Sequence, residues 1–231
     1  MKPLKIEYRS RLPHIAPVGA SFFVTFRMAD ALPQRIIQGL KWELEKATEQ
    51  LKREKPPDYR QLILVEQKRF FGKYDYQLDV QPFGSCALKK PKITAIVKKE
   101  LHRYDGDLYD LIAYSIMPNH VHILIDTVIQ ITDYEMIGGE LMPVLMDEIP
   151  EEFEELYRIM KSIKGTSAYY ANKVLGKTGI TFWQKDSYDH YIRNDKEWNN
   201  IVAYILNNPV KAKFVKTWQE WEGTYLKPTL E

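Results

Sequence analysis

Cysteine, long apolar runs and net charge are all scarce in this sequence. Cys86 is the only cysteine among 231 residues, which excludes an internal disulfide and a zinc site built from several thiolates. No apolar stretch approaches the roughly 20 residues that cross a bilayer, and the first residues lack the apolar core of an export signal. The 33 Lys and Arg nearly balance the 31 Asp and Glu, so charge does not drive disorder. We therefore expect a globular cytoplasmic protein without a membrane partner.

The composition is sufficient for one full hydrophobic core, because hydrophobic residues make up 45% of the chain and aromatic residues 13%. The sequence contains no internal repeat and no long Gly/Ser linker. We expect a single domain over 1–231 with its core at about 9–216. Two insertions are expected within it, a helical one at about 34–75 and an acidic one at about 127–150.

Charge is segregated along the chain. Residues 126–155 include ten Asp and Glu and no Lys or Arg, whereas 89–103 and 161–193 each include six basic residues. Tyr, Phe and Trp are interleaved with the basic residues of 161–193. Basic side chains beside aromatic ones are typical of surfaces that follow a phosphate backbone and stack unpaired bases. Charge runs are more often solvated helix faces, so this pattern supports nucleic-acid binding only when a catalytic site is also present.

Hydrophobic periodicity and turn residues predict the secondary structure. Strands are expected at 21–26, 108–116, 120–125 and 187–192, and helices at 34–55, 59–74, 91–104, 151–175 and 195–206. We expect Asp195 to cap the last helix and Pro209 to end it. The acidic segment between the third strand and the helix at 151–175 is expected to be irregular, because it contains Gly138, Gly139, Pro143 and Pro150.

The order of the core elements is strand, helix, two strands, helix, strand, followed by a last helix. This order predicts an α+β fold with a ferredoxin-like split βαβ core, in which two helices cover one face of an antiparallel sheet. The other face is expected to be free for a site.

Two histidines alternate with apolar residues in the predicted strand at 120–125. Because side chains alternate along a strand, His120 and His122 project from one face while Val121 projects from the other. An isolated pair of this kind is commonly structural. As a metal site it also needs an oxygen donor and an open coordination position.

The last helix offers such a donor. Tyr204 and Asn208 are four residues apart and share one edge of its apolar stripe. Because Pro209 is expected to fray the helix there, Asn207 is the alternative ligand. A phenol and an amide are therefore expected side by side.

Several blocks of the sequence together resemble a known family. They are Arg11-Leu-Pro-His14, Gly19 to Arg27, Met117-Pro-Asn-His120-Val-His122-Ile-Leu124, Lys161-Ser-Ile-Lys164-Gly-Thr-Ser-Ala168, Trp183 to Arg193, and Tyr204-Ile-Leu-Asn-Asn208-Pro-Val-Lys211-Ala212. The chain closely resembles the single-tyrosine HUH transposases, of the IS200-like type, and among them the REP-associated tyrosine transposases. The resemblance spans most of residues 9–216. Lys213 stands where the family usually has glycine.

The resemblance implies a role for each matching residue. Tyr204 corresponds to the nucleophile, His120 and His122 to the paired metal ligands, and Asn208 to the residue that completes the metal site. The implied reaction cleaves and rejoins single-stranded DNA beside palindromic, REP-like hairpins through a 5′-phosphotyrosine intermediate. Oxygen and imidazole ligands suit Mg²⁺ or Mn²⁺ as the cofactor.

The resemblance and the basic composition also indicate contacts with DNA. The candidates for phosphate contacts are Lys161, Lys164, Arg193 and Lys211, those for hairpin or guide bases are Arg11, His14 and Arg27, and Trp183 is a candidate for base stacking. The alternatives are a core position for Trp183 and an ion pair of Arg193 with Asp189 or Asp195. The implied setting is the bacterial cytoplasm, associated with the nucleoid, as a monomer or homodimer.

Two other functions fit parts of the sequence. One is a host protein that binds DNA hairpins without transposing them. The other is a nucleotide hydrolase of the histidine-triad type, whose third histidine position is occupied here by Leu124.

Overall fold

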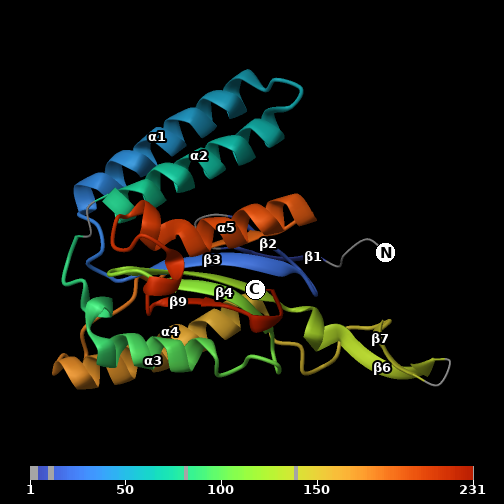
Figure 1. The fold of residues 1–231 in the computed structure, drawn as a ribbon. Helices are drawn as coiled ribbons and strands as arrows, with labels where there is room; N and C mark the ends of the chain where they lie inside the picture. Colours follow the sequence, from blue (N-terminus) through green and yellow to red (C-terminus); the bar gives the residue numbers. More distant parts are fainter. Residues whose placement is uncertain (1–4, 10–12, 81–82, 138–139, 231) are drawn as a thin grey trace.

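A five-stranded antiparallel sheet forms the centre of the molecule. The computed structural model describes residues 5–9, 13–80, 83–137 and 140–230. The strand order is β8-β3-β5-β4-β9 (Figure 1). The strands are β3 (Ser21–Arg27), β4 (Asp110–Ile116), β5 (His120–Asp126), β8 (Tyr188–Tyr191) and β9 (Thr224–Leu226).

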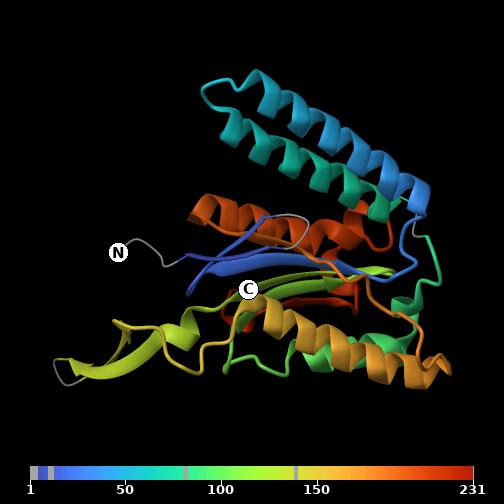
Figure 2. The same ribbon diagram turned by 180° about the vertical axis from the view of Figure 1, so that it is seen from behind.

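The topology of the sheet confirms the predicted fold class. Helix α3 (Pro91–Leu101) connects β3 to β4, and α4 (Leu156–Leu175) connects β5 to β8. Each crossover skips one strand, because β5 lies between β3 and β4 and β3 lies between β5 and β8. This is the split βαβ arrangement. Figures 1 and 2 show α3 and α4 together on one face of the sheet.

The main hydrophobic core lies between that face and the two helices. Val121, Ile123 and Ile125 of β5 are fully buried there. Ile93 of α3 and Ile163 of α4 meet them, also fully buried. Each such side chain contributes roughly 1.5–3 kcal/mol through the removal of apolar surface from water. This face therefore holds the sheet and the helices together.

The opposite face is covered, and the prediction that it is free was wrong. Helix α5 (Asp195–Lys211) lies along it, and the helical hairpin of α1 (Gln34–Glu54) and α2 (Tyr59–Val80) stands above α5 (Figures 1 and 2). Ile205 of α5 packs with Phe23 and Leu124 of the sheet in a second, smaller hydrophobic cluster. The apolar stripe of α5 needs this cover, since a helix with one apolar face is stable only when that face is packed.

Helix α5 does not end before Pro209 as predicted but continues through it to Lys211. Pro209 removes only one backbone donor, and the carbonyl of Asn208 still accepts a hydrogen bond from the N–H of Ala212 at 2.9 Å. Asn194 caps the helix instead of Asp195, because its side chain accepts a hydrogen bond from the N–H of Glu197.

Three further helix boundaries differ from the prediction by three residues or more. Helix α3 ends at Leu101, three residues before its predicted end at Tyr104. Helix α2 extends to Val80, six residues past its predicted end at Tyr74. Helix α4 begins at Leu156 and not at 151, so the glutamates of 151–155 precede its first turn. The extension of α2 has a functional consequence, described below.

The acidic segment is not irregular as predicted. It contains an antiparallel hairpin of β6 (Thr132–Ile137) and β7 (Glu140–Leu145), which extends away from the sheet (Figure 1). The N-terminal β1 (Lys5–Arg9) and β2 (Pro13–Pro17) form another two-stranded sheet, which was not predicted. Within the described ranges, no helix has the length and apolarity needed to cross a membrane.

Candidate active site

The two histidines of β5 face each other beneath α2 and α5. Their Nε2 atoms are 3.1 Å apart, and both side chains are fully buried. The N–H at Nδ1 of His120 donates to the side-chain oxygen of Asn119 at 2.8 Å. The amide nitrogen of Asn119 donates to two backbone carbonyls, which fixes this orientation. The Thr25 hydroxyl lies 2.8 Å from Nδ1 of His122.

This arrangement leaves the Nε2 lone pair of His120 directed at the neighbouring ring. Burial and the nearby positive charge of Arg27 lower the pKa of His120 to about 3. Burial, and then the proximity of His120 and Lys211, lower the pKa of His122 well below its ordinary value. Both rings are therefore neutral near pH 7. Neutral imidazoles held by partners at Nδ1 are the form in which histidine binds a metal through Nε2.

Helix α2 brings two carboxylates to the same place. Oδ1 of Asp79 is 3.5 Å from Nε2 of His120, and Oδ1 of Asp75 is 3.6 Å from Nε2 of His122. Neither Oδ1 atom has a hydrogen-bond partner among the described residues, and both are buried. Burial and the neighbouring Asp79 raise the pKa of Asp75 well above its usual range, and burial raises that of Asp79 to about 6 against the opposing effect of Lys211.

These two carboxylates were missed because α2 was expected to end at Tyr74. The pattern that would have revealed them is the spacing of Phe71, Tyr74, Asp75, Leu78 and Asp79, which places all five on one face of a helix. An acidic residue within an apolar helix stripe is buried when the helix packs, and a buried carboxylate requires a partner.

Helix α5 places its tyrosine beside the histidine pair, and its asparagine follows one helical turn later. The ring of Tyr204 lies edge-on to that of His122, with 5.4 Å between the ring centroids. The Tyr204 hydroxyl is buried and has no hydrogen-bond partner in the described part of the chain, and neither has the side-chain amide of Asn208, which is 1% exposed. Asn207 is exposed, and its amide donates to the carbonyl of Ala203. Asn208 is therefore the better placed of the two candidate ligands.

Lys211, one of the predicted phosphate contacts, lies at the rim of this site. Its ammonium nitrogen is 3.5 Å from Oδ2 of Asp79 and 5.7 Å from the centre of the Tyr204 ring. Its side chain is 55% exposed. The structure thus gives Lys211 both a partner inside the site and access to solvent.

The donor set fits a divalent cation. Asp75, His120 and His122 each direct one ligand atom to a region in which these atoms lie within 4.8 Å of one another. Imidazole nitrogen with carboxylate and amide oxygen is a set that Mn²⁺ and Mg²⁺ accept. Several unpartnered buried polar atoms in one place are costly, and a cation would satisfy them.

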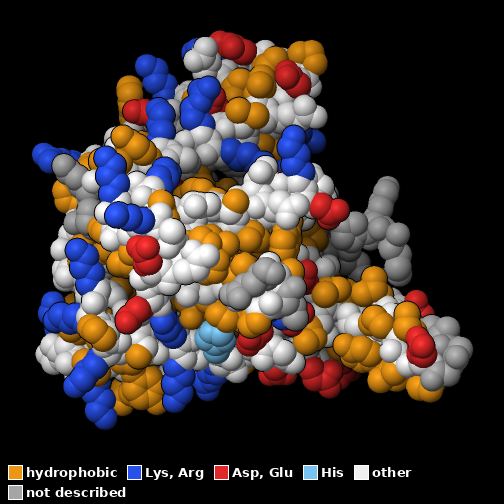
Figure 3. Space-filling view, viewed as in Figure 1, with side chains coloured by type: hydrophobic (Ala, Val, Ile, Leu, Met, Phe, Trp, Pro, Cys, Tyr) orange, Lys and Arg blue, Asp and Glu red, His pale blue; other side chains and the backbone are white. Residues whose placement is uncertain are grey.

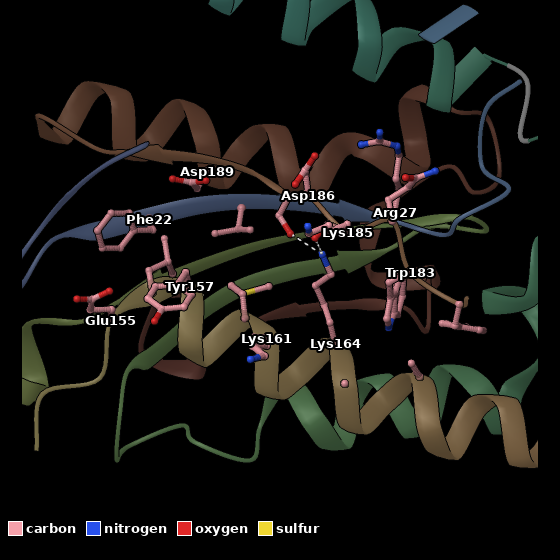
Figure 4. Close-up of a pocket in the computed structure, with 18 of the residues that line it drawn as sticks. Phe22, Arg27, Glu155, Tyr157, Lys161, Lys164, Trp183, Lys185, Asp186 and Asp189 are labelled. Atoms are coloured by element: carbon pink, nitrogen blue, oxygen red, sulfur yellow. Dashed lines mark hydrogen bonds between the residues drawn. The ribbon is translucent and has the colours of Figure 1, made fainter. Parts of the chain in front are cut away.

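Four of the predicted DNA contacts line a single cavity of about 1150 Å³ beside α4 and β8 (Figure 4). They are Arg27, Lys161, Lys164 and Trp183. The ammonium of Lys164 donates to the carbonyl of Lys185 at 2.8 Å and to the Ser187 hydroxyl at 3.0 Å. Burial lowers the pKa of Lys164 to about 8, although Asp186 opposes the shift.

Arg27 connects this cavity to the histidine pair, because its backbone is paired with that of His120 in the sheet. Its guanidinium lies 4.3 Å from the centre of the Tyr74 ring of α2. Burial lowers the pKa of Arg27. The residue therefore contacts the helical hairpin and the cavity together.

Trp183, although it lines the cavity, and the remaining predicted DNA contacts are placed less favourably for binding DNA. Trp183 is 5% exposed and donates its indole N–H to the Ser167 hydroxyl at 2.9 Å, so it is part of the core and is not a free stacking surface. Arg193 is exposed, with its guanidinium 4.7 Å from the centre of the Tyr191 ring. Arg11 and the side chain of His14 lie outside the described part of the chain.

Surface charge follows the segregation seen in the sequence. Figure 3 shows many Lys and Arg side chains on the side of the molecule where α3 begins, and Asp, Glu and hydrophobic side chains on the β6–β7 hairpin. The exposed lysines at the start of α3 include Lys89, Lys90 and Lys92. A polyanion would therefore be attracted to the body of the molecule and repelled by the β6–β7 hairpin.

Known proteins are similar to parts of this chain, although no protein-family model matches it. A putative REP-associated tyrosine transposase of Haemophilus influenzae is 25% identical over 113 residues, which are 49% of this chain and 56% of that protein. An uncharacterized protein of the same organism is 27% identical over 99 residues, or 42% of this chain and 52% of that protein. The chain therefore spans about half the length of the curated relatives it matches.

Among solved structures, one described as a REP-associated tyrosine transposase bound to a REP hairpin matches with a TM-score of 0.46 and 15% identity. The match covers 94% of this chain and 82% of that chain. The sequence similarity to the curated protein confirms what the motifs predict: this chain resembles the REP-associated tyrosine transposases.

Proposed function

We propose that this chain is a metal-dependent transposase that cleaves and rejoins single-stranded DNA beside palindromic hairpins. The observation that carries the proposal is the position of Tyr204, whose ring contacts that of His122 and whose buried hydroxyl has no partner among the described residues. A structural tyrosine with a buried hydroxyl normally makes a hydrogen bond. The similarity to the curated transposase supports the same conclusion.

In the proposed reaction, the Tyr204 oxygen attacks a backbone phosphorus. The phenol gives its proton to water as a bond forms between its oxygen and phosphorus. The bond from phosphorus to the 3′ oxygen breaks, and the leaving 3′ oxygen takes one proton from water. The product is a 5′-phosphotyrosine, which conserves the phosphodiester so that a free 3′-hydroxyl can rejoin the strand by the reverse step.

His120, His122 and Asn208 would hold the divalent ion, Mg²⁺ or Mn²⁺. When bound, such an ion neutralises the non-bridging phosphate oxygens and polarises phosphorus. The ordinary pKa of a phenol is about 10, so Tyr204 is a weak nucleophile near pH 7 without help. The ammonium nitrogen of Lys211 lies 5.7 Å from the centre of the Tyr204 ring, where it would contact a phosphate bound beside Tyr204.

DNA would extend from this site to the cavity beside α4. Lys161 and Lys164 line the cavity, and Arg27 lies between it and the histidine pair. A bound phosphate would compensate for the unfavourable burial of the Lys164 charge. We assign the unpaired segment next to a DNA hairpin to this cavity.

A second function, DNA binding without cleavage, is favoured by the burial of the site. His120 and His122 are fully buried, and Asn208 is 1% exposed, so a strand reaches them only after α2 or α5 moves. A nucleotide hydrolase of the histidine-triad type is not favoured, because Leu124 is a fully buried member of the smaller hydrophobic cluster.

The test is formation of a covalent adduct. The parent protein, incubated with labelled single-stranded hairpin DNA and Mn²⁺, is expected to form a protein–DNA adduct that survives denaturing electrophoresis. Tyr204→Phe is expected to lower the yield by more than about 1000-fold while DNA binding is retained, because the variant lacks only the nucleophilic oxygen. Tyr225→Phe, on the far edge of the sheet, is the matched control and is expected to match the parent. Adduct formation by Tyr204→Phe at the parental level would refute the mechanism.

A further inference from the structure

The helical hairpin of α1 and α2 buries side chains against the body of the molecule at one end, and Lys68 in the middle of α2 adds an exposed ion pair with Glu197 of α5. Among the described side chains, its buried residues are Ile37 near the start of α1 and Tyr74, Asp75, Leu78 and Asp79 near the end of α2. The ring of Phe71 also stacks on that of Tyr188 in β8, with 3.5 Å between the ring centroids. The distal part of the hairpin stands free of the sheet (Figure 1).

Two of these buried residues are carboxylic acids, an unusual choice for a packing contact. Burying a carboxylate without a partner is unfavourable by several kcal/mol, so apolar residues would attach the hairpin more strongly. The position of the two acids above the histidine pair therefore indicates a role in binding and not only in packing.

Asp75 has the geometry of a metal ligand. Its Oδ1 atom is 3.6 Å from Nε2 of His122, and the two Nε2 atoms are 3.1 Å apart. Two ligand atoms that are each about 2.1–2.2 Å from one ion at usual coordination angles lie about 3.0–3.6 Å apart. Asp75 is 3% exposed, and its Oδ1 has no hydrogen-bond partner in the described ranges.

Asp79 also places its Oδ1 atom near a histidine, 3.5 Å from Nε2 of His120, but its other oxygen has a charged partner. Its Oδ2 atom is 3.5 Å from the ammonium of Lys211, so an ion pair already compensates part of its charge. It also lies outside the group of three residues whose ligand atoms are mutually within 4.8 Å. The two acids are one helical turn apart on the same face of α2, which makes Asp79 a matched control for Asp75.

We propose that Asp75 is a ligand of the metal in this site, so that the helical hairpin supplies part of the metal site and the bound ion fastens the hairpin to the sheet. This inference rests on the proposed function, since it uses the same histidine pair. The helical hairpin would then contribute a metal ligand, which the sequence motifs of the chain do not predict.

The test measures metal binding directly, by calorimetry and by electron paramagnetic resonance of Mn²⁺. Asp75→Asn keeps the size of the side chain and removes the charge, and it is expected to weaken Mn²⁺ binding by at least about tenfold. Asp79→Asn is expected to change it by less than about threefold. Hydrogen exchange gives a second measure: Mn²⁺ should slow exchange in 59–80 in the parent and not in Asp75→Asn.

The outcomes separate this inference from the proposed function. If Asp75→Asn binds Mn²⁺ as the parent does while His122→Ala does not, Asp75 is not a ligand but the proposed metal site stands. If His122→Ala also binds as the parent does, the proposed metal site itself is wrong. Asp75→Ser is the second variant in case Asp75→Asn does not fold, and parental Mn²⁺ binding by it would equally overturn the inference.

Discussion

The two faces of the central sheet differ in chemistry, although the same strands build both. Each face carries an apolar cluster, but the histidine pair lies on the α5 face. On the α3 and α4 side, Val121, Ile123 and Ile125 are fully buried in the main apolar core. On the α5 side, the alternate residues His120 and His122 are equally buried but lie among polar atoms without partners. Burial therefore has two different effects in one strand. On one face it stabilises the fold by removing apolar side chains from water, and on the other it leaves polar atoms without described hydrogen-bond partners.

The first prediction compares neighbouring residues on the two faces. Ile123→Ala is expected to lower the free energy of unfolding by about 3–4 kcal/mol, because it opens a cavity in the main core. His122→Ala is expected to lower the free energy of unfolding by less than half as much, because the ring that it removes lies beside buried polar atoms without described partners and not within the main apolar core. Urea denaturation followed by circular dichroism gives both values. Equal costs would show that the histidine face stabilises the fold as strongly as the core does.

The second prediction concerns the cavity beside α4 and β8, at the edge of the sheet. Because burial lowers the pKa of Lys164 in the folded protein to about 8, the unfolded chain, with a pKa near 10.5, binds the proton more tightly. The free energy of unfolding should therefore gain a contribution from Lys164 as the pH rises from 8 to 10.5. We expect the stability of the parent relative to Lys164→Met to rise by roughly 1–2 kcal/mol over that interval.

Denaturation series at pH 7 and pH 10 measure this difference. Lys161→Met, an exposed position on the same helix, is the control and should show no comparable change. If the difference in the free energy of unfolding between the parent and Lys164→Met is the same at both pH values, burial does not lower the pKa of Lys164 in the folded protein.

The third prediction concerns the β6–β7 hairpin, which belongs to neither face. Tyr134 and Met136 are 58% and 68% exposed, and the described side chains of 132–136 and 140–145 do not belong to either hydrophobic cluster. Replacing 132–145 by a short Gly-Ser linker should change the melting temperature by less than about 2 °C. Mn²⁺ binding should be unchanged. A larger loss of stability would show that the hairpin supports the sheet.

Much of the fold was predictable because its signals are local. The alternation in 120–125 and the apolar stripes of α3 and α4 each need only a few neighbouring residues to be recognised. The order of elements then led to the split βαβ core. The prediction failed where local signals were ambiguous: Pro209 did not end α5, and the acidic segment formed a hairpin despite its glycines and prolines.

The candidate site was predictable only in part. The motifs predicted Tyr204, His120, His122 and Asn208 as site residues, and the structure places the first three rings next to one another. Trp183 was selected for its residue type, and only its burial and its bond to Ser167 show that it is a core residue. Type and spacing cannot distinguish a core aromatic side chain from an accessible one.

The sequence alone determined that two imidazoles project from one side of a strand and that a phenol and an amide share one side of a helix, because both facts follow from the periodicity of the backbone. Only the tertiary structure decided that Asp75 lies within 4 Å of His122. That contact joins residues 47 positions apart, on a helix and a strand with no sequence pattern in common. It depends on how the helical hairpin packs above the sheet, which many side chains determine together.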